Sequence, residues 1–325
     1  MSESSNKSAE LIGAFDRRVE RRLQRRQFFR NAGGLGLGLV GGTLISACGG
    51  GSGSSASAQS APTDPEILNF ALNLEYLESQ FYTYATTGAG LAASMTAGVG
   101  TMGTVIPGQQ VPFQDPVVQA YANEIANDER EHVNFLRSAL GSAAVAMPSI
   151  DIGGTNPNGA FSNAARAAGL VGAGVAFNPY ANDNNFLLGA FIFEDVGVTA
   201  YKGASPLISN KTFLEAAAGI LAAEAYHAGL VRTVLFAKGV DTASIYTAAN
   251  AISAARDSLD NNGHDDQGIT GATPGSSNIV PLDSNGLAFS RGYGNVLNIV
   301  YLTSSVATKG GFFPNGVNGV LNMSA

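Results

Sequence analysis

Tryptophan is absent from this chain of 325 residues, cysteine occurs once and histidine occurs three times. A single thiol, Cys48, cannot close an internal disulfide, so no disulfide framework holds the fold together. No stretch alternates polar and apolar residues as a half-buried strand does, which argues against a β-rich domain. Charged residues make up 13% of the chain and hydrophobic residues 45%, values that describe an ordinary globular core beneath a weakly charged surface.

Charge is divided unevenly along the chain. Residues 1–47 hold eight Lys or Arg and four Asp or Glu, a net of +4, and the remainder holds ten and twenty-one, a net of −11, which together give the total of −7. An acidic main part lacks the electrostatic footprint of a nucleic-acid binder. We therefore expect no nucleic-acid partner.

The first 47 residues have the plan of an export signal. A basic region ends in Arg25-Arg26-Gln27-Phe28-Phe29-Arg30 and is followed by an uncharged run of 17 residues, 31–47. This run is too short and too rich in glycine for a good membrane-spanning helix, and a basic region before a short apolar one is typical of a secretory signal. The Arg-Arg-x-Phe arrangement resembles a twin-arginine signal, with Gln24 where Ser or Thr is usual.

The uncharged run ends in Leu44-Ile45-Ser46-Ala47-Cys48, which resembles a bacterial lipobox. The alternative is an ordinary signal with a chance cysteine, but the only cysteine stands where a lipobox requires one. The resemblance implies an exported chain in the cell envelope or periplasm, anchored to the membrane by lipid on Cys48. Residues 48–63 then form a flexible tether, and residues 64–325 form the folded domain.

Start and stop signals divide the remaining chain into long helices joined by glycine-rich loops. Asp64-Pro65 and Asp115-Pro116 each combine an N-cap residue with proline at the first helical position. Four helices of about 20–25 residues are sufficient for a four-helix bundle, so the sequence predicts an all-α fold with additional C-terminal helices. The expected long helices cover residues 64–87, 115–140, 184–201, 210–238 and 242–259, and shorter apolar segments cover 163–170 and 294–307.

Two of the three histidines occur in Glu-x-x-His motifs, each on a predicted long helix. Side chains three residues apart lie on one face of a helix, as two ligands of one metal ion require. Two other long helices each carry a single glutamate followed seven residues later by a tyrosine. The two halves of the chain thus repeat one pattern, as an ancient duplication would produce. The residues are Glu75, Tyr82, Glu129, His132, Glu194, Tyr201, Glu224 and His227.

The four glutamates and two histidines have the composition of a two-metal site. Two divalent ions about 3.5–4 Å apart repel each other strongly, and four carboxylates offset four positive charges. Mixed imidazole and carboxylate ligands suit iron or manganese, with iron slightly preferred, and no thiolate is available to recruit softer metals. Acids inside apolar runs, such as Glu194 after Phe191-Ile192-Phe193, cost free energy unless they are paired or coordinated. The predicted metal ligands are Glu75, Glu129, His132, Glu194, Glu224 and His227.

Several neighbouring positions have two interpretations. Glu78 lies one turn from Glu75 and is an alternative ligand, although only Glu75 has the seven-residue spacing to a tyrosine. Asp128 either accepts a hydrogen bond from a ligand histidine or is exposed. Tyr82 and Tyr201 either donate hydrogen bonds to ligand carboxylates or are plain core residues.

The order of these residues resembles that of the ferritin-like superfamily, which includes rubrerythrins and manganese catalases. Residues 68–78, LNFALNLEYLE, and 310–316, GGFFPNG, resemble more specifically the desiccation-related ferritin-like proteins of plants and bacteria. The resemblance covers about residues 64–320 and implies a ferritin-like four-helix bundle. It does not select a reaction, because members of the superfamily store iron, reduce or dismute peroxide, or oxidise other substrates.

Some of these activities fit the chain better than others. The cysteines of the rubrerythrin iron domain are missing, and a lipid-anchored chain with long loops is poorly suited to an iron-storage shell. We expect a redox enzyme that acts on peroxide or O2 in stress protection. The alternatives are a non-enzymatic metal-binding or structural protein of the envelope in desiccation tolerance, and a bundle whose acidic centre binds nothing and has raised carboxyl pKa values.

Overall fold

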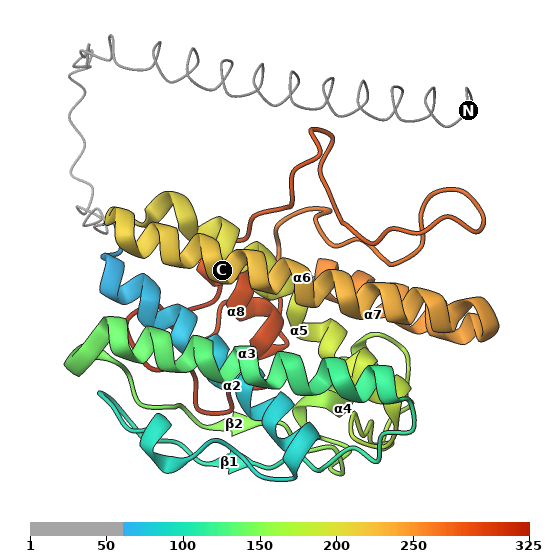
Figure 1. The fold of residues 1–325 in the computed structure, drawn as a ribbon, viewed down its shortest axis with the longest axis horizontal. Helices are drawn as coiled ribbons and strands as arrows, with labels where there is room; N and C mark the ends of the chain where they lie inside the picture. The colour runs from blue at the N-terminus through green and yellow to red at the C-terminus, as the bar shows by residue number, and fades with distance from the viewer. Residues whose placement is uncertain (1–60) are drawn as a thin grey trace, which may run out of the picture. The chain divides into compact units, whose positions relative to one another are not determined.

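The computed structural model describes residues 61–325, which form a mostly helical fold (Figure 1). The predicted export signal, the lipobox and most of the tether lie outside these residues. Three short 3-10 turns, at Ala93–Met95, Gly141–Ala143 and Ser205–Leu207, lie in the connections. The helices are α2 (Asp64–Thr87), α3 (Pro116–Leu140), α4 (Ala160–Ala167), α5 (Asp183–Ala204), α6 (Lys211–Asp241), α7 (Ala243–Leu259) and α8 (Tyr293–Tyr301). The predicted all-α class is confirmed.

Capping side chains set the starts of the long helices. Asp115 accepts hydrogen bonds from backbone N–H groups in the first turn of α3, as predicted. The prediction for α2 was wrong by one residue, because its N-cap is Thr63, whose backbone N–H donates to Glu66 Oε2 at 2.7 Å. Asp64 instead accepts from the backbone N–H of Ser209 at 2.8 Å, which ties the start of α2 to the segment before α6.

The helices α2, α3, α5 and α6 form the bundle. The helix α2 packs most extensively on α3, and α5 on α6, so two helix pairs come together around a shared interior. The helix α7 packs on α5 and α6, and α8 on α5 and α7. Among the described helices, α6 is long and apolar enough to cross a membrane by length and composition, but Glu224, His227 and Arg232 are buried along it, as befits a core helix of a bundle.

A small parallel sheet joins the two long loops of the first half, although the sequence indicated no strand. The strand β1 (Val105–Ile106), after α2, pairs with β2 (Ile150–Asp151), after α3. Two residues per strand are too few for an alternating pattern to be visible in the sequence. The pairing fixes the loop of residues 88–114 to the segment that follows α3.

The C-terminal tail packs into the core. The ring of Phe312 is fully buried, with its centroid 5.1 Å from that of Phe161 and 4.9 Å from that of Phe193. The preceding Gly311 has a φ of +46°, and a Cβ at this position would lie 2.6 Å from the carbonyl oxygen of Val300. Glycine is therefore required at this turn, which directs the phenylalanine between α4 and α5.

Candidate metal centre

The predicted ligands converge in the interior of the bundle. The four glutamates are at most 1% exposed. Two groups of ligand atoms, each group within 4.8 Å of one another, share one glutamate: Glu75, Glu129, His132 and Glu224 form the first, and Glu129, Glu194 and His227 form the second. Adjacent donor sets with a shared carboxylate are consistent with a di-metal carboxylate site.

Both histidines turn Nδ1 towards the shared glutamate. His132 Nδ1 lies 3.4 Å from Glu129 Oε2 and 3.2 Å from Glu75 Oε2. His227 Nδ1 lies 3.1 Å from Glu129 Oε1 and 3.6 Å from Glu194 Oε2. The two oxygens of Glu129 thus face different histidines, so Glu129 would supply a donor to both groups of ligand atoms.

Asp128 lies on the far side of the His227 ring from the centre. Its Oδ2 is 3.2 Å from His227 Nε2. An imidazole that donates its Nε2 proton to this carboxylate keeps Nδ1 free as an acceptor for a metal. The side chain of Asp128 is also 38% exposed. Asp128 therefore both lies within hydrogen-bond distance of the histidine and contacts solvent, the two interpretations that the sequence left open.

Two tyrosines connect α2 and α5 through the centre. Tyr82 on α2 donates its O–H to Glu194 Oε1 on α5, and Tyr201 on α5 donates to Glu75 Oε1 on α2. Burial and the charge of the facing glutamate raise the pKa of each phenol well above its usual range, so both remain protonated donors. Each glutamate keeps its Oε2 directed towards a histidine, as the distances above show.

Several buried polar atoms of the centre lie close to one another but make no well-oriented hydrogen bond with any of the described residues. They are both carboxylate oxygens of Glu129 and Glu224, Oε2 of Glu194 and Nδ1 of His227. Each unsatisfied buried group costs about 1–3 kcal/mol. Cations would satisfy all of them at once, and this mixture of carboxylates and imidazoles suits iron or manganese. The residues present therefore fit a two-metal centre.

The pKa values of the centre reflect the crowding of carboxylates and imidazoles in a buried space. Burial raises the pKa of Glu75 to about 7 and that of Glu194 to about 8. Burial would also raise the pKa of Glu129, but the close approach of His132 and His227 lowers it below its usual range. Burial would lower the pKa of the two imidazoles, yet the facing carboxylates raise it to about 11 for His132 and about 9 for His227. Without a metal, protons must supply the charge that balances the carboxylates.

Glu78 is a fifth buried glutamate at the centre, with 5% exposure. Burial and the charges of neighbouring glutamates, Glu129 first among them, raise its pKa well above its usual range. Its oxygens belong to neither group of close ligand atoms, whereas those of Glu75 do. The geometry favours Glu75 over Glu78, and the role of Glu75 as a metal ligand stays a prediction.

Gly197 on α5 leaves the space that Glu224 occupies. A Cβ at position 197 would lie 2.1 Å from Glu224 Oε2 and 2.9 Å from its Cδ. Helix propensity alone marks a mid-helix glycine as unfavourable. The close approach of the Glu224 carboxylate explains the glycine, and no pattern in the sequence indicated this contact.

A buried ion-pair network lies beside the centre. Arg232 Nη1 and Arg256 Nη2 are each 2.7 Å from Asp195 Oδ2, and Asp195 directly follows Glu194 on α5. The network therefore anchors the helix that carries this glutamate. Sequence reasoning missed it because its members are far apart in the chain. The full network comprises Asp195, Arg232, Arg256, Asp260, Asp265, Asp266 and Arg291.

Comparison with known proteins gives three similarities. The family model of the ferritin-like domain matches residues 63–237, a range that includes all six predicted ligands. The chain is 28% identical over 268 residues to the ferritin-like catalase Nec2 of Nesocodon mauritianus, covering 79% of this chain and 84% of that protein. It is 30% identical over 240 residues to the desiccation-related protein PCC13-62 of Craterostigma plantagineum, covering 70% and 74%. No solved structure matches the chain significantly.

Proposed function

The chain belongs to the ferritin-like domain family, and on this premise we propose that it is a two-metal oxidoreductase that removes hydrogen peroxide. The observation that carries the proposal is the buried centre, where the predicted ligands meet and several of their atoms have no hydrogen-bond partner within residues 61–325. The relative named a ferritin-like catalase supports peroxide as the substrate. Iron and manganese both suit the donors, and iron is slightly preferred.

Peroxide dismutation is balanced without another reactant. Two molecules of hydrogen peroxide give two of water and one of O2, because one peroxide supplies the two electrons and two protons that reduce the other. A bound pair of iron or manganese ions supplies this two-electron exchange.

The chain's own residues orient the donors and restrict access. Tyr82 and Tyr201 hold Glu194 and Glu75 through one oxygen each, so these carboxylates keep a defined position. Among the predicted ligands, the side chain of His132 is the most exposed, at 12%, while the glutamates are almost fully enclosed. Burial of this degree favours a substrate as small as peroxide over a larger one.

The test is metal content and turnover of the mature protein, from Gly49 onward, purified without chelators. We expect about two iron or manganese ions per chain and one O2 released for every two peroxide molecules consumed. The double variant Glu129→Ala, Glu224→Ala should lose both, whereas Glu131→Ala, an exposed change on α3, should keep both. A fully metallated protein that leaves peroxide untouched would refute the proposed reaction.

A non-enzymatic protective role is the second candidate. It is favoured by the 30% identity to a protein named as desiccation-related and by the near-complete burial of the carboxylates. In this case the centre would hold metal but show no turnover. Deletion of the gene should then lower survival after drying, and unaffected survival would contradict this role.

We also propose that the chain is exported and attached to the membrane through lipid on Cys48. Support comes from residues 25–30 and 44–48, which resemble a twin-arginine signal and a lipobox. Replacing the cysteine, Cys48→Ala, should move the protein from the membrane fraction to a soluble or unprocessed form. Equal membrane association of the variant and the natural chain would contradict the anchor.

A further inference from the structure

Glu78 on α2 is a buried acid to which neither the predicted ligand set nor the proposed reaction assigns a role. It is 5% exposed, and none of the hydrogen bonds or ion pairs within residues 61–325 involves its side chain. A buried carboxylate without donors costs free energy unless a cation or a proton balances it. The balancing group must come from the immediate surroundings of the side chain.

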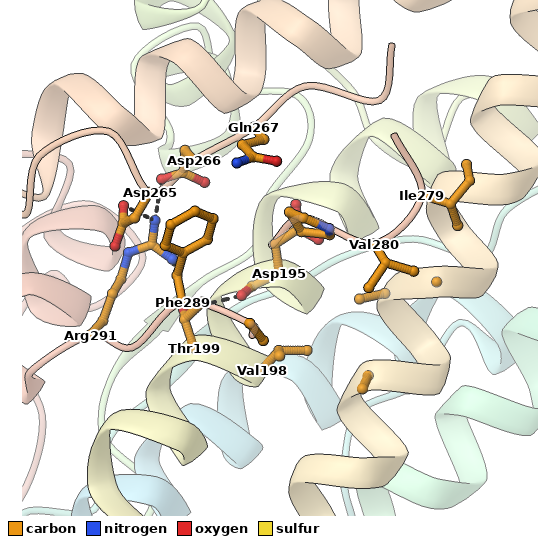
Figure 2. A pocket seen from close by; sticks show the side chains of 15 residues that line it. Asp195, Val198, Thr199, Asp265, Asp266, Gln267, Ile279, Val280, Phe289 and Arg291 are labelled. Atoms are coloured by element: carbon orange, nitrogen blue, oxygen red, sulfur yellow. Dashed lines mark hydrogen bonds and ion pairs between the residues drawn. The ribbon is translucent and has the colours of Figure 1, made fainter. Parts of the chain in front are cut away.

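The other buried acids outside the predicted ligand set all have donors. In the pocket drawn in Figure 2, Asp265 lies beside Arg291, whose Nη2 is 2.8 Å from Asp265 Oδ1. The remaining ones pair with arginine or accept hydrogen bonds from backbone N–H groups; they are Asp151, Asp183, Asp195 and Asp260. Glu78 is therefore the one buried acid outside that set for which residues 61–325 supply no donor.

A small cavity borders Glu78 and provides no partner for it. Its volume is about 10 Å³, and its other walls are a glycine and apolar side chains of α2, α5, α8 and the tail, among them Leu77, Val196 and Phe312. A buried water needs about 10–15 Å³ and about two to four polar partners, whereas this cavity offers one polar side chain. Water in the cavity is therefore a poor partner for the carboxylate.

The internal repeat of the chain places Glu78 at the metal centre. Glu75 on α2 corresponds to Glu194 on α5, so Glu78, three residues later, corresponds to Gly197. A Cβ at Gly197 would lie 2.1 Å from Glu224 Oε2, which shows that this position of the repeat faces the predicted ligands. On α2 the same position carries a carboxylate, and both Glu78 and Gly197 line the small cavity.

The charges around Glu78 agree with this placement. Burial, and then the charges of Glu129 and Glu194, raise the pKa of Glu78 well above its usual range. Burial, and then the charge of Glu78, likewise raise the pKa of Glu224. The Glu78 carboxylate thus faces predicted ligands on one side and an apolar cavity on the other.

The two groups of ligand atoms are unequal, because the first has four donors and the second, formed by Glu129, Glu194 and His227, has three. We propose that Glu78 is the fourth donor of the second group and a seventh metal ligand of the loaded centre. Each ion then has one imidazole and three carboxylates, with Glu129 shared. The oxygens of Glu78 lie outside both groups, so binding requires its side chain to turn towards the ions, and the adjoining cavity leaves space for this movement. This inference rests on the metal centre of the proposed function and not on peroxide as the substrate.

The test is stepwise binding of manganese to the metal-free mature protein, measured by competition with a chromophoric chelator. Glu78→Gln keeps the volume of the side chain and removes the carboxylate, so one of the two ions should bind at least about 10-fold more weakly while the other is little changed. Glu124→Gln, the same change at an exposed position on α3, should bind both ions as the natural chain does. Unchanged affinity for both ions in Glu78→Gln would overturn this inference alone, and a natural chain that binds no metal would overturn the centre as well.

The stability of the metal-free protein separates a ligand from a packing residue. The glutamine in Glu78→Gln has nearly the same size and buries no charge, so the midpoint of urea denaturation should not fall. Weaker binding of both ions together with a lower midpoint would show a packing role and overturn the inference. Should Glu78→Gln fail to fold, Glu78→Asp takes its place, because it withdraws the carboxylate by one methylene group and should weaken the same single ion.

The charge of Glu78 should also affect the oxidation state of a bound iron pair. Five carboxylates carry one negative charge more than two divalent ions balance, so the fifth carboxylate favours a pair with one trivalent ion. Glu78→Gln should therefore raise the reduction potential of the iron-loaded centre, by about 59 mV for each tenfold change in a one-electron equilibrium. A potential in Glu78→Gln equal to or below that of the natural chain would overturn the assignment of Glu78 to the metal pair.

Discussion

Replacing Gly197 by alanine should disturb the metal centre without unfolding the bundle. A glycine-to-alanine change inside a helix ordinarily stabilises a protein by about 0.5–1 kcal/mol, because the unfolded chain loses conformational freedom. Here the added Cβ would lie 2.1 Å from Glu224 Oε2, against an ordinary contact of 3.4 Å or more. The carboxylate must therefore move by roughly 1 Å.

The displaced group is the carboxylate of Glu224, a predicted metal ligand in a fully buried position. Glu224 is fully buried, and neither of its oxygens has a protein hydrogen-bond partner among the described residues. A shift of about 1 Å at a reacting site commonly lowers activity by about 100-fold, and a disturbed ligand shell lowers metal affinity by about 10- to 100-fold. We expect losses of this size for Gly197→Ala, together with a much smaller change in the stability of the metal-free fold.

The assay is competitive metal binding with a chromophoric chelator, followed by urea denaturation of the metal-free protein. Gly219→Ala is the matched control, because Gly219 also lies within a long helix and a Cβ there would meet nothing within 4 Å. The control should bind metal normally and gain about 0.5–1 kcal/mol of stability. Normal metal affinity in Gly197→Ala would refute the assignment of Glu224 to the centre.

Three further predictions concern the hydrogen bonds, the tail and the protonation of the centre. Tyr82→Phe removes only the donor to Glu194, so metal affinity should fall about 10- to 100-fold while the fold is retained; an unchanged affinity in the same chelator assay would contradict this role. Phe312→Ala should lower the free energy of unfolding by about 3–5 kcal/mol, whereas the exposed change Val320→Ala in the same tail should alter it by less than about 0.5 kcal/mol, both measured by urea denaturation. For the metal-free protein, stability should fall as the pH rises from 4.5 through about 7 and about 8, because Glu75 and Glu194 keep their protons in the folded state over this range after the unfolded chain has released them. Denaturation curves at several pH values test this sign, and a stability that rises over this window would contradict it.

Much of the helical framework could be predicted because its signals are local. Asp115-Pro116 starts α3 and Gly141 follows its end, so short stretches of sequence marked this helix correctly. At α2 the competing capping residue Thr63 took the position predicted for Asp64, because Asp64 is used in a contact with a distant segment. Local signals therefore located α2 correctly but identified the wrong N-cap residue.

The parts that escaped prediction depend on contacts between distant segments. The pairing of β1 with β2 involves only two residues on each side, and neither segment has a pattern of its own. The Phe312 ring is buried by α4 and α5, which lie more than a hundred residues earlier in the chain. The arginine–aspartate network likewise joins α5, α6, α7 and the segment 265–291. Such partners have no fixed spacing that a pattern could display.

The sequence by itself determined the all-α class and predicted which residues lie together at the centre, because a helix converts spacings of three and seven residues into a shared face. Only the tertiary structure decided how those faces meet. It directs the two oxygens of Glu129 to different histidines and crosses the tyrosine bonds between α2 and α5. It also favours Glu75 over Glu78, since the choice depends on which side of α2 faces the other helices in space. Periodicity within one helix is written in the chain, whereas the register between helices is set by packing of the whole core.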